Sequence, residues 1–581
     1  HTFVPKWPSL RIKQVVYSIA TVLLTFLFLG RIPFYKIFNS SYNAMLINGK
    51  NDDISAIINT AINEYNALMY IVGAVVLSAA LCYFLVKFLS WGTKKYSDYA
   101  DTQLVCPTWY PKTKKTQWIT GIGLTVVIGI LGLFFRFGGA FNYTNSINWE
   151  SAARLSSNLL NETILDDVQA LYRVKSIAKR ADELEVINLT PQELSEKISA
   201  IGGTFDGKDF DGSFTRTITT ERLAEQPQSI NIVLGESYGL WPFLAEYNEP
   251  GAYLVEQGRK YAASPQAMST QLALAQGTGT MPAINGLLTG MPDTGLYPNY
   301  EGESFKQPYG LGIGSVMKKL GYKTVFWYGG FSTWQNVKNF TLSQGFDEFH
   351  DASEMPSDEG NAWGVADKYM FKAISAYMDQ HRGEKILNVI MTTSNHPPYS
   401  VNVAKEGYDV NKVKGHLPDT IAETDKQLNE MGHIWYADHV MGEFIASEEK
   451  ADPSALFVIT GDHSERFTFA REVSPNVAST IPIIFYGRGI HKDWLAPNAF
   501  GMSIQIIPTL AELAGRPGQT YEAMVPSLFT QEEFVFNHRL YLDKNGKVLE
   551  QSANMPQSYG DMIKNMRELA AWRIKHGDVI Q

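Results

Sequence analysis

Three uncharged apolar stretches lie in the N-terminal quarter of the chain, and none of similar length follows them. They cover residues 14–30, 65–86 and 116–135. Each is long enough to cross a bilayer as a helix, which takes about 20 apolar residues. Arg31-Ile-Pro-Phe34 follows the first stretch where a signal peptide would have a small-residue cleavage site. The pattern therefore predicts a retained anchor and a transmembrane domain of three spans over residues 1–141.

The basic residues predict how these spans are oriented. Lys and Arg precede the first stretch and crowd the loop between the second and the third, whereas the loop between the first and the second holds Asp52, Asp53 and Glu64 against Lys36 and Lys50. Because cytoplasmic loops are enriched in Lys and Arg, we expect the N-terminus and the second loop in the cytoplasm. Everything after Arg136 then lies outside.

The outer part begins with a polar segment, residues 142–226, that has helical spacing. Within it, Thr190-Pro-Gln-Glu193 has the form of a helix start, with Thr as the N-cap, Pro at the first helical position and Glu reaching back to the cap. We interpret this segment as a helical connector along the membrane surface.

Residues 227–581 alternate between short β-branched runs and helical stretches. The runs cover 231–234, 324–327, 386–391, 456–460 and 481–486. This alternation predicts an α/β domain with a mostly parallel central sheet and helices on both faces. A hairpin pattern at 540–547 predicts a small antiparallel sheet near the C-terminus, followed by a final helix.

Candidate metal ligands directly follow two of the predicted strands. Glu236 comes after the run that ends at Gly235, and Asp462-His463 come after the run that ends at Gly461. Buried parallel strands deliver such residues to the carboxyl edge of an open sheet, where sites of α/β proteins form. Together with the oxygen of Thr280, they make a mixed O/N site for a divalent cation. A cation there would lower the pKa of the threonine hydroxyl and make it a nucleophile toward phosphorus.

This constellation resembles the alkaline-phosphatase and sulfatase superfamily, and most closely its lipoteichoic-acid-synthase-like branch of membrane-anchored transferases. Five segments occur in the order of that branch: residues 229–236, 277–282, 326–349, 392–399 and 455–463. Residues 503–515 also resemble the last core helix of the superfamily. The resemblance implies that Glu236, Thr280, Asp462 and His463 bind one metal ion. Members of the branch usually carry five spans, so either two helices are absent here or the natural chain begins before His1.

The resemblance also assigns the catalytic residues. The nucleophile of the family opens a helix, and Thr280, which precedes a helical pattern, fits that place; Thr278 is its rival, with a plain loop hydroxyl as its alternative role. His396, in Asn395-His-Pro397, matches the histidine that faces the substrate phosphate. A lone histidine is more often structural, so this assignment depends on the motif.

Two further residues are expected to bind substrate. Trp334 lies in the segment that resembles the donor headgroup pocket, with polar neighbours that argue against full burial. Two positions later the lipoteichoic acid synthases have a phosphate-binding arginine, whereas this chain has Asn336. An amide carries no charge and no guanidinium fork, which leaves the headgroup open.

The implied function is that of a metal-dependent phosphoglycerol transferase of the bacterial cytoplasmic membrane, with its catalytic domain on the extracytoplasmic or periplasmic side. A phospholipid, with phosphatidylglycerol favoured, would donate its headgroup through a phospho-threonine to a glycan or glycolipid acceptor. The expected cofactor is Mn²⁺, with Zn²⁺ and Mg²⁺ as alternatives, because one imidazole with oxygen ligands suits several ions.

Two other functions remain open. The same scaffold could act as a phosphoethanolamine transferase or a phosphodiesterase, or as a non-catalytic lipid-sensing membrane protein. The related phosphoethanolamine transferases are commonly rich in disulfides, whereas both cysteines here, Cys82 and Cys106, precede the outer domain. A non-catalytic relative would be expected to lack the nucleophile or a ligand, and this chain has them all.

Charge excludes one further class of partner. The chain has a net charge of −9, and residues 1–141 hold 13 of its 50 Lys and Arg but only 5 of its 59 Asp and Glu, so the outer domain is strongly acidic. Nucleic-acid binding needs clustered Lys and Arg for phosphate contacts. We therefore expect no nucleic-acid partner.

Overall fold

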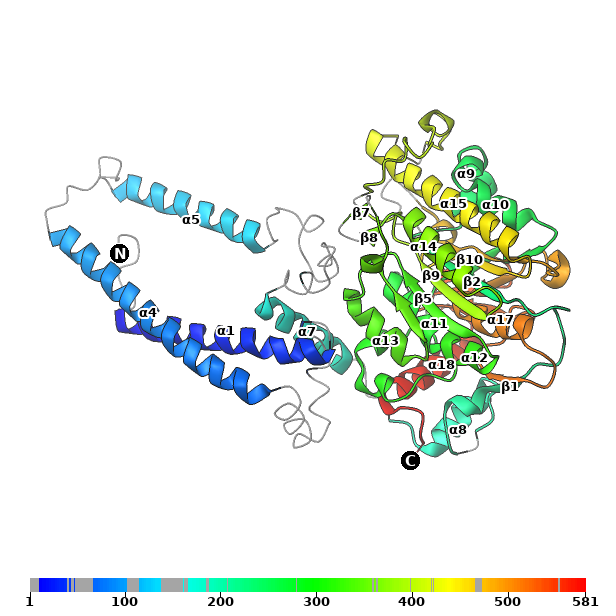
Figure 1. Cartoon of the computed structure of the whole chain (residues 1–581), viewed down its shortest axis with the longest axis horizontal. Coiled ribbons are helices and arrows are strands. Elements are labelled where there is room, and N and C mark those ends of the chain that lie inside the picture. Colours follow the sequence, from blue (N-terminus) through cyan, green and yellow to red (C-terminus); the bar gives the residue numbers. More distant parts are fainter. Residues whose placement is uncertain are drawn as a thin grey trace. The chain divides into compact units, whose positions relative to one another are not determined.

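The computed structural model contains an N-terminal helical unit and a large α/β unit (Figure 1). It describes residues 10–38, 41–42, 46, 66–101, 114–136, 160, 166–183, 188–205, 207–277, 279–357, 360–361, 364–397, 399–419, 421, 423–464, 473–551 and 554–580. One compact unit comprises His1–Ala152 and Glu162–Ala178, and the other comprises Ala153–Asn161 and Lys179–Gln581. The predicted connector thus contributes to both units, and its place at the membrane surface stays a prediction.

The first unit contains long apolar helices where the hydrophobic pattern predicted membrane spans. These are α1 (Leu10–Phe38), α4 (Ala67–Asp101) and α5 (Lys114–Arg136). Among the described residues, Leu10–Tyr35 and Ala67–Gly92 are long and apolar enough to cross a membrane, which suggests a membrane anchor. The third predicted span forms α5, whose described apolar part is Thr125–Phe134, and its crossing stays a prediction.

Polar contacts fix helices to one another within this unit. Gln14 of α1 donates a hydrogen bond to Ser90 of α4 over 2.9 Å. At the other end of α1, Arg31 forms an ion pair of 3.0 Å with Asp167, the first residue of α7 (Asp167–Glu183). A polar contact between apolar helices fixes their register, because moving either helix would leave the group unpaired.

A seven-stranded, mostly parallel sheet forms the centre of the second unit. Its spatial order is β3-β12-β10-β2-β9-β5-β6. The strands in that order are Ala267–Ser269, Ile483–Gly487, Leu456–Gly461, Ser229–Gly235, Ile386–Met391, Lys323–Tyr328 and Glu348–His350. The five from β10 to β6 are parallel to one another, whereas β12 pairs antiparallel with β10 and β3. The predicted fold class is thereby confirmed.

Four predicted strands lie within β2, β5, β9 and β10, but the predicted strand 481–486 is wrong as one unit. Pro482 divides it into β11 (Thr480–Ile481) and β12, which belong to different sheets. Proline cannot donate a ladder hydrogen bond, so the chain leaves one sheet there and enters another.

Helices cover both faces of the large sheet (Figure 1). Along β2, Ile230, Ile232 and Leu234 belong to one hydrophobic core and Val233 to the other, as the two-residue period of a strand requires. The first core includes residues of α11 (Thr280–Thr289), α12 (Ile313–Lys319), α13 (Val337–Ser343), α17 (Ile506–Ala514) and α18 (Gln557–His576). The second includes residues of α9 (Asn248–Leu254), α10 (Glu256–Ala263), α14 (Asp367–Gln380) and α15 (Asp425–Ala451).

Smaller elements complete the unit. Helix α8 (Pro191–Ala200) starts with the predicted capping box, in which Thr190 and Glu193 bond each other's backbone N–H. The predicted C-terminal hairpin is also confirmed, as part of the three-stranded sheet β15-β16-β17. The remaining elements are β1 (Thr215–Thr217), β4 (Leu272–Leu274), β7 (Gly360–Asn361), β8 (Gly364–Val365), α16 (Pro475–Ser479), β13 (Phe500–Met502), β14 (Thr520–Glu522), β15 (Phe534–Phe536), β16 (Leu540–Asp543) and β17 (Val548–Glu550).

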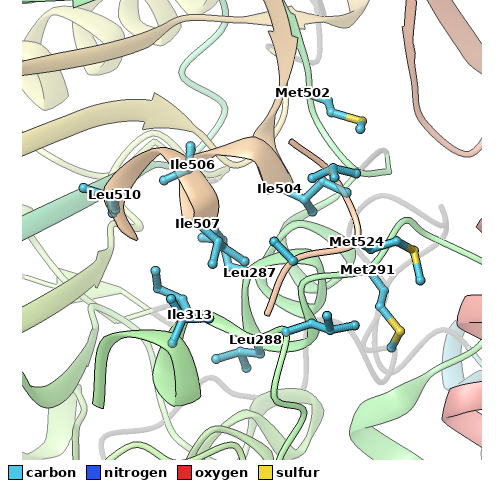
Figure 2. Close-up of a cluster of buried hydrophobic side chains, with 14 of the residues drawn as sticks. Leu287, Leu288, Met291, Ile313, Met502, Ile504, Ile506, Ile507, Leu510 and Met524 are labelled. Carbon is cyan, nitrogen blue, oxygen red and sulfur yellow. The ribbon is translucent and has the colours of Figure 1, made fainter. Parts of the chain in front are cut away.

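Helix α11 is held by hydrophobic packing along its length. Figure 2 shows Leu287 and Leu288 of α11 facing a cluster of apolar side chains from other elements. The labelled partners include Ile313 of α12, Ile504 of a short 3₁₀ helix, and Ile506, Ile507 and Leu510 of α17. This packing fixes the helix whose first residue is Thr280.

We expect Leu287→Ala to lower the free energy of unfolding by about 2–5 kcal/mol, because it leaves a cavity at a site that is 2% exposed. Urea denaturation of the full chain in detergent, followed by tryptophan fluorescence, measures this loss. Leu342→Ala is the control: Leu342 is 38% exposed, so its change should stay within about 0.5 kcal/mol. Equal losses in the two variants would contradict the proposed packing.

Candidate active site

The strand register brings the predicted ligands to one edge of the sheet. Gly235, the last residue of β2, pairs with Gly461, the last residue of β10. On its other side, β2 pairs with β9, so that Leu234 lies opposite Met391. The residues that follow these strand ends, Glu236 and Asp462, are therefore neighbours, although 226 positions separate them in the sequence.

Glu236, Asp462 and His463 form a buried group that suits a metal ion. Each offers one ligand atom, and these atoms lie within 4.8 Å of one another. The imidazole Nε2 of His463 is 3.6 Å from Oε1 of Glu236 and 3.5 Å from Oδ2 of Asp462. All three residues are at most 5% exposed. Two buried carboxylates so close together need a positive partner to be stable in the ionised form.

The hydrogen bonds of His463 prepare its ring for metal binding. Nδ1 lies 2.7 Å from the carbonyl oxygen of Ser464, an acceptor, so Nδ1 carries the hydrogen. In the neutral ring this leaves the lone pair on Nε2, the nitrogen that faces both carboxylates. A histidine that donates through one nitrogen to a carbonyl and ligates through the other is the usual arrangement at metal sites.

Asp462 has one oxygen bonded to the protein and one without a hydrogen bond. Oδ1 accepts the backbone N–H of Ser237 at 2.8 Å and that of His463 at 2.7 Å. Oδ2 is buried and accepts no hydrogen bond from the described residues. Burial, with a smaller contribution from Glu236, raises the pKa of this carboxyl to about 6, and protonation of His463 would lower it. A buried carboxylate oxygen without a donor fits a metal ligand.

Thr280 lies where the sequence predicted the nucleophile. It is the first residue of α11, and its hydroxyl donates a hydrogen bond of 3.1 Å to Oε2 of Glu236. The same hydroxyl is near enough to Asp462 to lower its pKa, but its single hydrogen is used for Glu236. At this helix start, backbone N–H groups and the helix dipole favour the oxygens of a phosphoryl group. The rival, Thr278, lies outside the described residues.

Ser237 connects the two carboxylates. No motif in the sequence marks it as a site residue. Besides its N–H bond to Asp462, its hydroxyl donates to Oε1 of Glu236 over 2.9 Å. Its φ is +52°, a left-handed conformation that non-glycine residues adopt at a cost. Four of the five described non-glycine residues with positive φ lie in this and the neighbouring site loops: Ser237, Gln335, Asn336 and Tyr399. Such strain is concentrated at functional sites.

The loop after β9 carries His396 and holds the backbone of Glu236. Thr392 Oγ1 accepts the N–H of Glu236 at 2.9 Å, and Asn395 Nδ2 donates to the carbonyl of Glu236 at 3.2 Å. His396 Nδ1 lies 2.6 Å from the carbonyl oxygen of Pro397 and so carries the hydrogen. In the neutral ring this leaves the lone pair on Nε2. The loop thus fastens His396 to the chain segment that carries Glu236.

Trp334 and Asn336 lie in the loop after β5. The indole N–H of Trp334 is buried and has no hydrogen-bond partner among the described residues, and its ring lies 5.7 Å from that of Tyr328. The amide of Asn336 is buried: Nδ2 donates to the carbonyl of Asn299, and Oδ1 accepts from Asn339, each at 2.9 Å. Asn336 therefore shapes the loop. Direct contact of either residue with substrate stays a prediction.

Tyr328 is a further residue near the site that sequence reasoning did not single out. It ends β5 and is buried. Its pKa is raised well above the ordinary value by burial and by the charges of Glu236, Asp462 and Asp351. A strand-end tyrosine is common in any α/β sheet, so the sequence alone gave no reason to choose it.

Comparison with known proteins agrees with this geometry. Residues 232–516 match the family model described as Sulfatase. The matched region, slightly less than half of the chain, is thus similar to the sulfatases. The match extends from β2 to the end of α17 and includes every predicted site residue.

Several solved structures are similar to this chain at low sequence identity, and the first of those described below shares its fold. An alkaline phosphatase superfamily protein from Vibrio parahaemolyticus is 19% identical, with a TM-score of 0.50, and the alignment covers 67% of this chain and 97% of that one. The lipoteichoic acid synthase LtaP from Listeria monocytogenes is 16% identical, with a TM-score of 0.47 and coverage of 66% and 98%. The integral membrane phosphoethanolamine transferase EptA from Neisseria meningitidis is 12% identical, with a TM-score of 0.40 and coverage of 87% and 85%.

We expect Glu236→Gln and Asp462→Asn each to lower the metal content of the purified protein, because each replaces an ionised ligand with a neutral amide. Elemental analysis measures the content. Added Mn²⁺ should stabilise the wild-type protein by about 2.7 kcal/mol at a hundred times its Kd, and both variants less at the same concentration. Glu448→Gln, a buried acid outside the site, is the control that should keep its metal. Full occupancy in either site variant would remove that residue from the ligand set.

Proposed function

We propose that the protein is a membrane-anchored, metal-dependent transferase that moves a phosphoglycerol headgroup from a phospholipid to a glycan or glycolipid. The observation that supports this most is the position of Thr280. Its hydroxyl opens a helix and bonds Glu236 within the buried Glu-Asp-His group. A hydroxyl at a helix start beside a metal-ligand group suits nucleophilic attack on a phosphodiester.

The residues present fit a single divalent cation. Glu236, Asp462, His463 and the oxygen of Thr280 would hold it, and the unbonded Oδ2 of Asp462 and the oriented Nε2 of His463 support this assignment. When bound, the ion would supply the positive charge that favours a deprotonated threonine and neutralises the phosphoryl oxygens. Among ions suited to oxygen ligands with one imidazole, we favour Mn²⁺ over Zn²⁺ and Mg²⁺.

The chain's residues would divide the reaction into two transfers. Thr280 Oγ1 gives its proton to water and forms a bond to phosphorus, and the bond from phosphorus to the diacylglycerol oxygen breaks. That oxygen takes a proton from Nε2 of His396, whose ring is protonated at this stage and neutral afterwards. In the second transfer an acceptor hydroxyl gives its proton to Nε2 of His396 and takes the phosphoglycerol, and Thr280 takes a proton from water. The N–H groups at the start of α11 hold the phosphoryl oxygens in both steps.

The loop after β5 would form the headgroup side of the pocket. The buried, unpaired indole N–H of Trp334 is a donor for a ligand oxygen, and leaving it unused costs free energy. Asn336 would act by holding the loop in its left-handed conformation, since its amide bonds the protein on both sides. A neutral donor such as the Trp334 indole suits the oxygen of a glycerol hydroxyl and not an ammonium group, which is why we favour phosphatidylglycerol over phosphatidylethanolamine.

The apolar helices support a lipid donor. Leu10–Tyr35 and Ala67–Gly92 would keep the enzyme in the bacterial cytoplasmic membrane, with the α/β unit on the extracytoplasmic side. A lipid substrate stays in the same bilayer, so tethering raises the effective concentration of the encounter.

The experiment that tests the donor is mass spectrometry of the purified protein after incubation with each lipid separately. We expect phosphatidylglycerol to add the mass of a phosphoglycerol group to the peptide that contains Thr280. Addition of phosphoethanolamine alone would make the protein a phosphoethanolamine transferase. Lipid cleavage without transfer to a glycan acceptor would make it a phosphodiesterase. No adduct and no turnover of either lipid would favour a lipid-sensing role.

We expect Thr280→Ala to lower transfer by at least about 10³-fold, because the nucleophile is lost. Turnover of fluorescent phosphatidylglycerol measures this. Thr289→Ala is the matched control at the other end of α11, where the hydroxyl donates to the carbonyl of Asn285 and accepts the N–H of Met291, away from the Glu-Asp-His group. It should keep its activity despite some loss of stability. If Thr280→Ala stays active while Thr278→Ala does not, then Thr278 is the nucleophile.

A further inference from the structure

A buried carboxylate outside the ligand group holds the loop that carries His396. Asp367 begins α14 and is fully buried. Its Oδ1 accepts the backbone N–H groups of both Thr393 and Ser394, at 3.0 and 3.1 Å, and its own N–H donates to Ser394 Oγ at 2.8 Å. These partners lie 26 and 27 positions away. An aspartate in the first turn of a helix usually caps its own helix, whereas this one bonds another loop.

The turn held by Asp367 contacts the site at two points. Thr392 and Asn395, on either side of the two bonded residues, bond the N–H and the carbonyl of Glu236. The N–H of His396 donates to the carbonyl of Thr393 at 3.2 Å, so the histidine continues the same turn. Movement of this turn would displace His396 and the backbone of Glu236 together.

The segment that carries Asp367 is itself fixed to the loop after β5. The N–H of Val365 donates to the carbonyl of Gly329 at 3.0 Å, and Thr393 Oγ1 donates to the carbonyl of Val365 at 3.3 Å. Gly364 has a φ of +146°, and a Cβ there would lie 1.9 Å from the carbonyl oxygen of Gly329. Only glycine permits this approach, so Asp367 is anchored from a second direction.

We propose that Asp367 is a positioning residue of the active site, which fixes the Thr393–Ser394 turn and thereby the place of His396 beside Glu236. This inference rests on the proposed function of His396 and deepens it. Two successive N–H groups converge on one carboxylate oxygen, an arrangement that is stronger with an ionised acceptor than with a neutral one. The other oxygen, Oδ2, has no hydrogen-bond partner among the described residues. Among the described residues, all hydrogen bonds that this carboxylate accepts therefore come from the Thr393–Ser394 turn.

A double-mutant cycle with His396 tests the proposal. In the full chain in detergent, with fluorescent phosphatidylglycerol as substrate, Asp367→Ala should lower kcat/KM by about 10–100-fold, the range for groups that orient an active-site residue. In the His396→Ala background the same change should cost at least about 3-fold less, because only the contacts of the turn with the backbone of Glu236 are then disturbed. An equal loss in both backgrounds would overturn the proposal.

Three further measurements separate positioning from general stability. Amide hydrogen exchange in the peptide that contains Thr393 and Ser394 should be faster in Asp367→Ala. Asp367→Asn should recover most of the activity, since its Oδ1 can still accept the two N–H groups. The control Asp452→Ala removes a carboxylate that bonds Ser229 and Ser454 at the opposite edge of the sheet, and it should lower stability without lowering kcat/KM. Unchanged exchange, or an Asn variant as inactive as the Ala variant, would overturn the proposal.

If Asp367→Ala does not fold, Ser394→Ala takes its place in the cycle. It removes only the hydroxyl that accepts the N–H of Asp367, and it should cost about 2–10-fold, again less in the His396→Ala background. The proposed function fails separately. If His396→Ala alone leaves turnover unchanged, then the role of His396 is wrong, whereas exchange at Thr393 and Ser394 still reports whether Asp367 holds the turn.

Discussion

Two glycines end the central strands of the sheet, and the same tyrosine lies over both. A Cβ on Gly235 would lie 2.6 Å from Cβ of Tyr238, and one on Gly461 would lie 2.3 Å from the carbonyl oxygen of Tyr238. Because neither glycine has a side chain, the chain after β2 can turn sharply over the ends of both strands. That turn places Glu236 beside Asp462. The metal-ligand group depends on this close approach, since any larger residue at either strand end would push the loop outward.

The turn is costly, and a buried network supports it. Ser237 has positive φ, and the next residue, Tyr238, donates its hydroxyl to Asp438 of α15 over 2.6 Å. Asp438 also accepts the backbone N–H groups of Gln257 and Gly258, at 2.7 and 2.8 Å. Burial raises the pKa of this carboxyl to about 6, so its hydrogen bonds must offset the cost of burying charge at neutral pH. The second core thus holds the loop after β2, which begins at Glu236.

The sequence predicted those parts of the site that depend on local pattern. Glu236, Asp462 and His463 follow apolar runs that stop at glycine, and the parallel register then makes them neighbours. Thr280 begins a helix as its flanking residues indicated, and the capping box of α8 is visible in four consecutive residues. These features need only a few adjacent positions to be recognised.

The supporting residues could not be predicted, because their role arises from tertiary contacts. Ser237 and Asp367 are ordinary residues for a loop and a helix start, and only the folded chain shows which donors they meet. The error at Pro482 has a related cause. A β-branched run was taken as one strand, although the proline separates two strands that pair in different sheets. The sequence pattern predicts the helices and strands and where they end, whereas the contacts between them are determined by the tertiary structure.

The buried acids also connect the stability of the fold to its ligand. Asp462 is fully buried, and its pKa is raised to about 6, so the folded chain holds this proton more tightly than the unfolded chain does. In the absence of a cation, the contribution of this carboxyl to the free energy of unfolding is therefore complete below about pH 4, and it is lost as the pH rises through about 6. A bound divalent ion would reverse this dependence of stability on pH, because it favours the ionised form of the same carboxylate. The features that make the metal-free site unfavourable at neutral pH, namely burial, proximity of Glu236 and an oxygen without a donor, are those that would favour a bound cation. The fold accepts this cost at the edge of its central sheet, where a strained serine and two separate aspartate networks support the site. Selection for the site explains this arrangement better than selection for stability.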